Sequence, residues 1–149
     1  MRFFISALVL WVFVVSSPAW ACSCPVDAFG PEASHKNIAR AAYIIEGSVS
    51  FVAPQACDAQ ESCKGFIAFG ITPRKILKGQ DLAVVTAYAR IGTTCGVSTL
   101  ALQRMDFFVL YPRSGENAGE YRLATTCEGY IAPEDRIALM RGLYKPPVK

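Results

Sequence analysis

The six cysteines are the residues of this 149-residue chain whose type and spacing could do chemistry, and they stand at positions 22, 24, 57, 63, 95 and 127. Four cysteines can hold a zinc ion, whereas an even number of cysteines in an exported protein indicates disulfides. The first four cysteines do not repeat the two-residue spacing of zinc knuckles, which disfavours a zinc site. The choice between the two chemistries therefore depends on whether the chain is exported.

The first 21 residues are typical of an export signal. Arg2 precedes an apolar run over residues 3–15, and residues 19–21 read Ala-Trp-Ala, the small-x-small pattern that signal peptidases recognise. The run is shorter than the roughly 20 apolar residues of a membrane-spanning helix, and retention as a membrane anchor is the weaker alternative. We therefore predict a signal peptide at 1–21 and a secreted or periplasmic protein.

Cleavage after Ala21 would leave a mature chain that starts at Cys22 and keeps all six cysteines. A cysteine at this place also occurs in lipidated bacterial proteins, but those usually carry leucine where this chain has Ala19. We expect no membrane contact after cleavage unless Cys22 is lipidated. A formal charge of +3 is too small to indicate a nucleic-acid partner.

Three disulfides are expected in an oxidising compartment. The pair Cys57–Cys63 can close a local loop, whereas Cys22 and Cys24 point the same way in an extended chain and cannot comfortably bond to each other. Their partners are then Cys95 and Cys127, in an order that spacing does not decide. Either order fixes the start of the mature chain, and a rigid terminus loses little entropy on binding.

The rest of the chain supplies the elements that must position this start. Apolar residues spaced three and four apart predict a helix over 32–43, and Pro133 predicts the start of a second helix. Alternating or apolar segments predict five strands, at 43–53, 66–77, 82–90, 106–111 and 121–126. Five short strands in a chain of this size indicate a small closed barrel, which leaves no exposed edge.

Local features within these elements give further expectations. Gly47 predicts a bulge or bend in the first strand, and Pro73 predicts an edge or a bulge in the second. Strict alternation places Phe51 on the buried face of the first strand. The last helix is expected to bury an apolar stripe made of Ile137, Leu139, Met140 and Leu143.

Polar residues outside the cysteines give weaker signals. Glu46 and Asp106 are candidate buried acids, although solvated strand edges explain them more simply. Arg74, Lys75 and Lys78 form a basic edge, which we interpret as a solvated strand end in preference to a surface for an acidic partner.

The only histidine, His35, lies on the first predicted helix and is interpreted as a surface residue, not as a metal ligand or a base. With one histidine and no paired metal-ligand motif, the sequence nominates no active site. We therefore expect neither an enzyme nor a resident cofactor.

Several motifs follow one another in a characteristic order: C-S-C at 22–24, I-E-G-S-V at 45–49, C-G at 95–96, F-V-L-Y at 108–111 and T-C at 126–127. Together they resemble the inhibitory domain of tissue inhibitors of metalloproteinases (TIMP) and, more broadly, the netrin-like (NTR) module. The resemblance covers residues 22–144 and leaves 145–149 as a short tail. It implies a mainly β (α+β) fold, an OB-like five-stranded closed barrel with an N-terminal and a C-terminal helix. It also implies the pairs Cys22–Cys95 and Cys24–Cys127, beside the local Cys57–Cys63.

The resemblance also implies a mechanism. In that family, the α-amine and carbonyl oxygen of the first cysteine chelate the catalytic zinc of a protease, and here those atoms belong to Cys22. Ser23 would face the primary specificity pocket, and Cys24 and Pro25 would follow along the cleft. A neighbouring ridge would consist of Thr93, Thr94, Cys95 and Gly96. We call these eight residues the N-terminal edge.

Inhibition of a zinc metalloprotease is therefore the expected function. The alternative is a netrin-like protein-interaction module without zinc chemistry, either free or tethered to a membrane. In a third interpretation the cysteines only stabilise the fold. Unlike the animal members of the family, whose third bridge reaches the end of the domain, this chain has the local Cys57–Cys63 pair.

Overall fold

The computed structural model describes residues 23–53, 65–91, 96–114 and 119–147. Within these residues the chain forms a short 3-10 helix η1, three α-helices and five strands. In chain order they are η1 (Val26–Ala28), α2 (Pro31–Arg40), β1 (Tyr43–Val52), β2 (Gly65–Lys78), β3 (Val85–Ile91), α3 (Thr99–Arg104), β4 (Phe107–Pro112), β5 (Tyr121–Leu123) and α4 (Pro133–Met140). The predicted signal peptide lies outside the described residues, and none of the helices described here is long and apolar enough to span a membrane.

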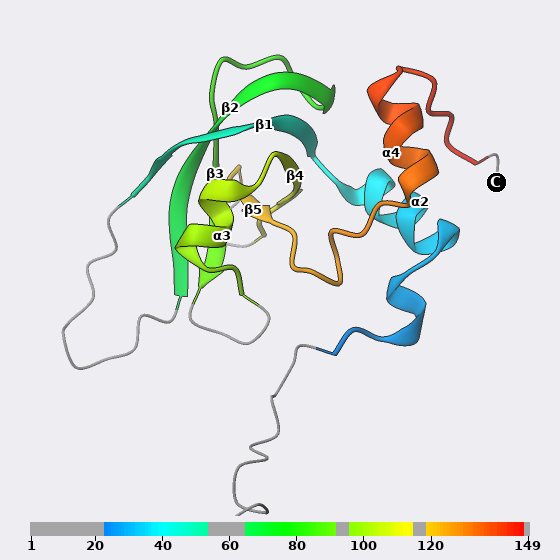
Figure 1. Ribbon diagram of the computed structural model, residues 1–149, viewed down its shortest axis with the longest axis horizontal. Coiled ribbons are helices and arrows are strands. Elements are labelled where there is room, and N and C mark those ends of the chain that lie inside the picture. Colours follow the sequence, from blue (N-terminus) through cyan, green and yellow to red (C-terminus); the bar gives the residue numbers. More distant parts are fainter. Residues whose placement is uncertain (1–22, 54–64, 92–95, 115–118, 148–149) are drawn as a thin grey trace, which may run out of the picture.

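The five strands close into a barrel in the order β1-β2-β3-β5-β4, with β4 returning to β1. All neighbouring strands are antiparallel except β3 and β5, which pair in parallel. Helices α2 and α4 lie next to each other on one side of the barrel (Figure 1). The predicted closed OB-like barrel with an N-terminal and a C-terminal helix is confirmed.

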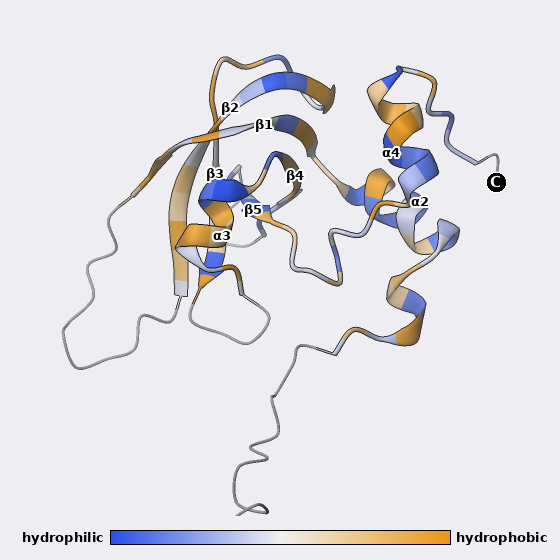
Figure 2. Ribbon diagram, viewed as in Figure 1, coloured by the Kyte–Doolittle hydropathy of each residue, from blue (hydrophilic) through white to orange (hydrophobic). Residues whose placement is uncertain are grey.

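The hydrophobic core has two parts, because β1 and β4 are buried on both faces. Ile45 and Phe108 point into the barrel, while Ile44 and Val109 belong to a second cluster that packs against α2 and α4. Each large side chain buried in this way stabilises the fold by about 1.5–3 kcal/mol. In Figure 2, β2 is hydrophobic near its start and at its C-terminal tip, with a hydrophilic stretch between them.

An irregularity is present at Gly47, because Glu46 pairs with Lys75 and Gly47 pairs with Pro73, but the extra residue of this bulge is Arg74 on β2 and not a residue of β1. A Cβ atom on Gly47 would lie 2.5 Å from the carbonyl oxygen of Thr72, so only glycine fits. Pro73 pairs with Gly47, and the ladder between β2 and β3 ends at Ile71. Pro73 therefore lies beside the bulge of β2 and at a point where β2 has no neighbour on the β3 side, as its missing N–H requires.

Two expectations about buried faces are wrong. A second register shift between Val49 and Phe51 reverses the faces of β1, so Phe51 is 46% exposed and Val52 packs against the core instead. In α4 only Leu139 of the expected stripe is buried, whereas Ile137 is 50% exposed. The stripe fails because the buried face of α4 carries Asp135 and Leu139, and because the helix ends at Met140, before Leu143.

The helix α3 is absent from the sequence prediction, which places no helix or strand between the strands at 82–90 and 106–111. Ser98 caps this helix by accepting a hydrogen bond from the backbone N–H of Ala101. Leu102 is its only buried residue, and it is fully buried in the barrel core. The first helix ends at Arg40, three residues earlier than predicted, because Tyr43 already begins β1.

Candidate functional site

A disulfide between Cys24 and Cys127 fastens the first described residues to the turn that follows β5. The two Cα atoms are 5.3 Å apart, although the residues are separated by 103 positions in the chain. This is the pairing that the family resemblance implies. The remaining cysteines fall outside the described residues, so the bridges Cys22–Cys95 and Cys57–Cys63 stay predictions.

The residues beside this bridge face solvent. Ser23 and Pro25 are exposed, and Val26 exposes 98% of its surface. The carbonyl oxygen of Pro25 accepts a hydrogen bond from the N–H of Ala28 at 2.9 Å, which closes the single turn of η1. The part of the N-terminal edge that the structure describes therefore combines a covalently fixed backbone with accessible side chains.

A second contact holds the same segment against the connection between β5 and α4. The rings of Phe29 and Tyr130 meet edge to face, with centroids 5.3 Å apart. The side-chain amide of Asn37, on α2, donates to the carbonyl oxygen of Tyr130 at 3.0 Å. The segment from Cys24 to Phe29 is thus attached to the rest of the protein both by a covalent bond and by packing.

Glu128 organises the turn that carries Cys127. Its carboxylate accepts two hydrogen bonds from the guanidinium of Arg122, at 2.6 and 3.1 Å, and one from the hydroxyl of Thr125 at 3.1 Å. Its backbone carbonyl oxygen accepts a hydrogen bond from the hydroxyl of Tyr111 at 2.6 Å. The hydrogen bond from Arg122 lowers the pKa of Glu128, because it stabilises the charged carboxylate.

Sequence reasoning missed Glu128 and Arg122, although a local signal exists. Thr125 and Glu128 have the threonine-x-x-glutamate spacing of a capping box, in which the glutamate reaches back to the first residue. The arginine, by contrast, comes from β5 and is placed by the barrel. Together these side chains fix the turn to which the disulfide is attached.

Gly96 lies close to the same turn. After β3, the N–H of Val97 donates to the carbonyl oxygen of Arg90 at 3.0 Å, which brings the chain back toward the strand. Gly96 and Thr126 then line one pocket of about 570 Å³, and Thr126 precedes the bonded Cys127. The structure therefore places Gly96 on the same pocket as the residue that precedes Cys127, whereas Thr93, Thr94 and Cys95 fall outside the described residues.

A serine, a histidine and an aspartate meet between α2 and α4, but they do not form a catalytic triad. The hydroxyl of Ser34 donates to Asp135 at 2.6 Å and accepts from the N–H of Ala132 at 2.9 Å. The Nε2 atom of His35 lies 3.4 Å from the same carboxylate. In a triad the histidine contacts the serine, whereas here Ser34 is fully buried and bonded to the acid itself. The cluster joins the two helices, and His35 is less exposed than expected.

The basic residues of β2 have a structural role that the sequence did not reveal. Lys75 donates to the carbonyl oxygen of the last residue of α4, and Lys78 donates to two carbonyls in the last turn of α2, at 2.6 and 3.0 Å. Positive charge at a helix C-terminus is favourable. The interpretation as a solvated strand end is wrong for Lys78, which is partly buried, but Lys75 is exposed as expected. Arg74 lies 3.5 Å from the partly buried Glu46, and Asp106 is exposed.

The described residues contain no group of three or more side chains able to hold a metal ion. No protein-family model matches the chain, and no curated protein matches it either. The candidate functional site is the N-terminal edge, whose described part the Cys24–Cys127 disulfide joins to the barrel.

Proposed function

We propose that this protein inhibits a zinc metalloprotease by placing the α-amine and carbonyl oxygen of Cys22 on the catalytic zinc of the protease. The observation that supports this proposal is the Cys24–Cys127 bridge, which attaches the chain two residues after Cys22 to the barrel. A free amine at Cys22 requires removal of residues 1–21. Signal cleavage and a secreted or periplasmic location therefore belong to the same proposal.

The chemistry of an α-amine suits this role. A catalytic zinc has three protein ligands and one open position, which an incoming nitrogen can fill. An α-amine has a pKa of about 8, so it gives up its proton to a metal at modest cost near neutral pH. Two residues of chain reach no farther than about 7 Å, so the position of Cys24 limits where this amine can act.

Rigidity supplies the energetic argument. Ordering a free peptide end on binding costs about 1–2 kcal/mol for each residue whose backbone becomes fixed. The bridge at Cys24 and the contact between Phe29 and Tyr130 order this segment before any partner arrives. For a segment of three residues, the binding free energy saved is about 3–6 kcal/mol.

The partner would contact more than the chain start. Ser23 would enter the primary specificity pocket of the protease, and Gly96 would belong to the ridge beside it with Thr93, Thr94 and Cys95. Val26 is 98% exposed and Phe29 is 51% exposed, and both add apolar area next to the edge. These two apolar residues equally favour the second candidate function, a netrin-like interaction module that binds a protein without zinc chemistry.

A one-residue extension separates the two candidates. The mature protein starting at Cys22 is titrated against a panel of zinc endopeptidases, beside a variant that carries one additional alanine before Cys22. We expect the extension to raise the inhibition constant at least about 100-fold, or about 2.8 kcal/mol, because Cys22 then no longer supplies a free amine. A variant with one additional alanine after Lys149 is the matched control and should inhibit normally.

Equal inhibition by the two extended proteins would exclude chelation through Cys22 even though inhibition is real. If neither protein inhibits any protease of the panel, and both still fold with oxidised cysteines, the interaction module becomes the better explanation.

A further inference from the structure

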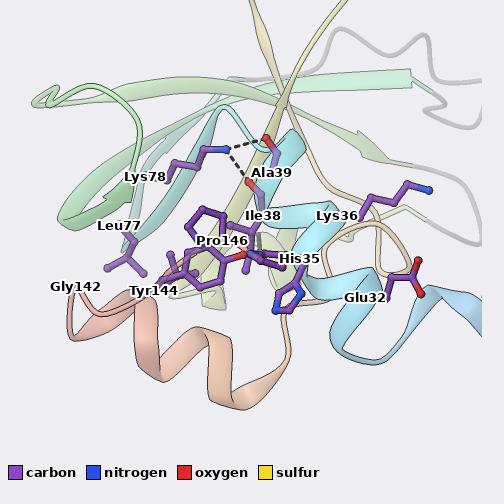
Figure 3. Close-up of a pocket in the computed structure, with 12 residues that line it drawn as sticks. Glu32, His35, Lys36, Ile38, Ala39, Leu77, Lys78, Gly142, Tyr144 and Pro146 are labelled. Atoms are coloured by element: carbon purple, nitrogen blue, oxygen red, sulfur yellow. Dashed lines mark hydrogen bonds between the residues drawn. The ribbon is translucent and has the colours of Figure 1, made fainter. Parts of the chain in front are cut away.

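A groove lies between α2, the C-terminal end of β2 and the segment that follows α4 (Figure 3). Its volume is about 970 Å³, which is within the range of pockets that hold small molecules. The walls are mostly apolar and include Ile38, Leu77, Leu139, Tyr144, Pro146 and Pro147. None of the described residues of the N-terminal edge lines it, so this groove is a second candidate site.

The end of α4 creates this shape. Gly142 adopts a left-handed conformation with φ +69°, and the N–H groups of Gly142 and Leu143 donate to Leu139 and Ala138, as in a Schellman motif. The chain therefore turns back, and Tyr144 packs against the cluster that includes Ile38 and Leu139. The prolines that follow keep the tail out of a helix, so it forms a wall of the groove.

Two lysines line this apolar groove, the exposed Lys36 and the partly buried Lys78. Lys78 donates to the carbonyl oxygens of Ile38 and Ala39 at 2.6 and 3.0 Å. An ammonium group has three protons, so one donor remains. No carboxylate among the described residues forms an ion pair with Lys78. Burial lowers the pKa of Lys78, because the charged form is partly removed from water.

The other charged groups of the groove leave the surroundings of Lys78 positive. Figure 3 shows Glu32 and Lys36 toward one end of the groove and Lys78 toward the other. His35 lies between them, 3.4 Å from Asp135 of α4. Asp135 is already bonded to Ser34, and Glu32 is opposite in sign to its neighbour Lys36. An anion would therefore find its best position beside Lys78.

We propose that this groove binds a small amphipathic carboxylate, with an aliphatic body against Ile38, Leu139 and Tyr144 and its carboxylate at the ammonium group of Lys78. Charge complementarity selects this class of ligand. A neutral ligand would leave Lys78 without a counter-ion, and a cation would be repelled. Because each buried methylene contributes roughly a fourfold gain in affinity, the affinity should rise with chain length until the groove is filled.

Isothermal titration calorimetry tests the proposal with decanoate, octanoate, decanol and decyltrimethylammonium, each below its critical micelle concentration. The protein is used with its disulfides intact. We expect decanoate to bind roughly 15-fold more tightly than octanoate, and more tightly than the alcohol and the cation. Absence of decanoate binding, or equal binding of the cation, would overturn the proposal.

Two lysines of the same strand provide the matched variants. Lys78→Met should weaken decanoate about tenfold and leave decanol nearly unchanged, the size expected for one charge-assisted hydrogen bond. Lys75→Met should change neither, because Lys75 also contacts a helix C-terminus but does not line the groove. An equal loss in both variants would mean that helix capping, and not ligand contact, controls binding.

A third variant guards against misfolding of Lys78→Met. Ala39 is an exposed groove residue of α2, so Ala39→Trp should fill the groove without disturbing the core. It should abolish binding of both decanoate and decanol while the far-UV circular dichroism stays unchanged. Undiminished binding would place the ligand elsewhere. Sedimentation of the free protein as a dimer that Ala39→Trp dissociates would show that a second copy occupies the groove, and would also overturn the proposal.

Discussion

Removal of the Cys24–Cys127 bridge by the double substitution Cys24→Ala/Cys127→Ala is expected to lower the free energy of unfolding by about 4 kcal/mol. The bridge joins residues 103 positions apart, and the chain-entropy model gives about 4.7 kcal/mol for a loop of that size at 25 °C. If the predicted bridge Cys22–Cys95 is also formed, the loop that remains to be closed shortens to about 34 residues. The expected loss is then about 3.8 kcal/mol.

The folded state should keep its secondary structure in this variant. The contact of Phe29 with Tyr130 and the hydrogen bond from Asn37 still hold α2 beside the connection after β5. The loss of stability therefore comes mainly from a less restricted unfolded chain. Urea denaturation under non-reducing conditions, followed by far-UV circular dichroism, measures it, and the m-value should rise because the unfolded chain exposes more surface.

The predicted local bridge Cys57–Cys63 would provide a matched comparison. The double substitution Cys57→Ala/Cys63→Ala opens a much shorter loop, for which the same model gives only about 2 kcal/mol. A loss below about 1 kcal/mol for the long bridge, or a larger loss for the local one, would refute the view that the start of the chain is covalently restrained. The entropic argument for inhibition would then lose its basis.

Two further predictions concern single residues. Glu128→Gln should cost about 1 kcal/mol at pH 7, a value reduced from that of a buried charged hydrogen bond because about a third of the side chain is exposed. The pKa of Glu128 is lowered in the folded state, so the extra free energy of unfolding of the wild type is fully present above the pKa of the unfolded state. This difference disappears as the pH falls through the folded pKa. Denaturation of both proteins at several pH values measures it. Gly47→Ala should lower the free energy of unfolding by about 1–3 kcal/mol, because its Cβ would meet the backbone at Thr72. The control Ala39→Gly, at an exposed helix position, should lower it by no more than about 1 kcal/mol.

The barrel could be predicted from the sequence because each strand carries its own pattern. Gly47 and Pro73 also marked the place of a register shift between β1 and β2, where they pair with each other. A glycine or a proline within a strand indicates such a place by itself, because its physical cause is local. The face of Phe51 could not be predicted in the same way. A bulge inserts one residue and reverses every side chain beyond it, and nothing in Val49 to Val52 announces that insertion.

The helix α3 illustrates a second limit. It has six residues, too few for a period of 3.6 to repeat, and Leu102 alone is buried. The cap at Ser98 is a signal, but serine before a threonine is equally common in loops. What decides the helix is the barrel core, in which Leu102 is fully buried.

The candidate site was predicted where covalent chemistry leaves few choices. Cys24 had only two distant partners, and the family resemblance selected Cys127. The roles of Lys75 and Lys78 could not be inferred, because both depend on helices that are distant in sequence and end beside β2. From the sequence alone, a charged residue on a strand is expected to face solvent, because its hydrogen-bond acceptor on a distant helix is visible only in the three-dimensional structure.

The two proposed sites are linked by α2 and yet should act independently. The segment before α2 leads to the Cys24–Cys127 bridge, whereas Lys78 contacts the other end of the helix. The helix rises about 1.5 Å per residue, so ten residues separate the two ends by about 15 Å, which exceeds the screening length of about 8 Å at physiological salt. Loss of the charge at Lys78 therefore leaves the proton affinity of an amine near Cys24 unaltered. The buried hydrogen bond from Ser34 to Asp135 joins α2 to α4 between the two ends, so we expect the segment at the Cys24–Cys127 bridge to keep its position when the groove is filled.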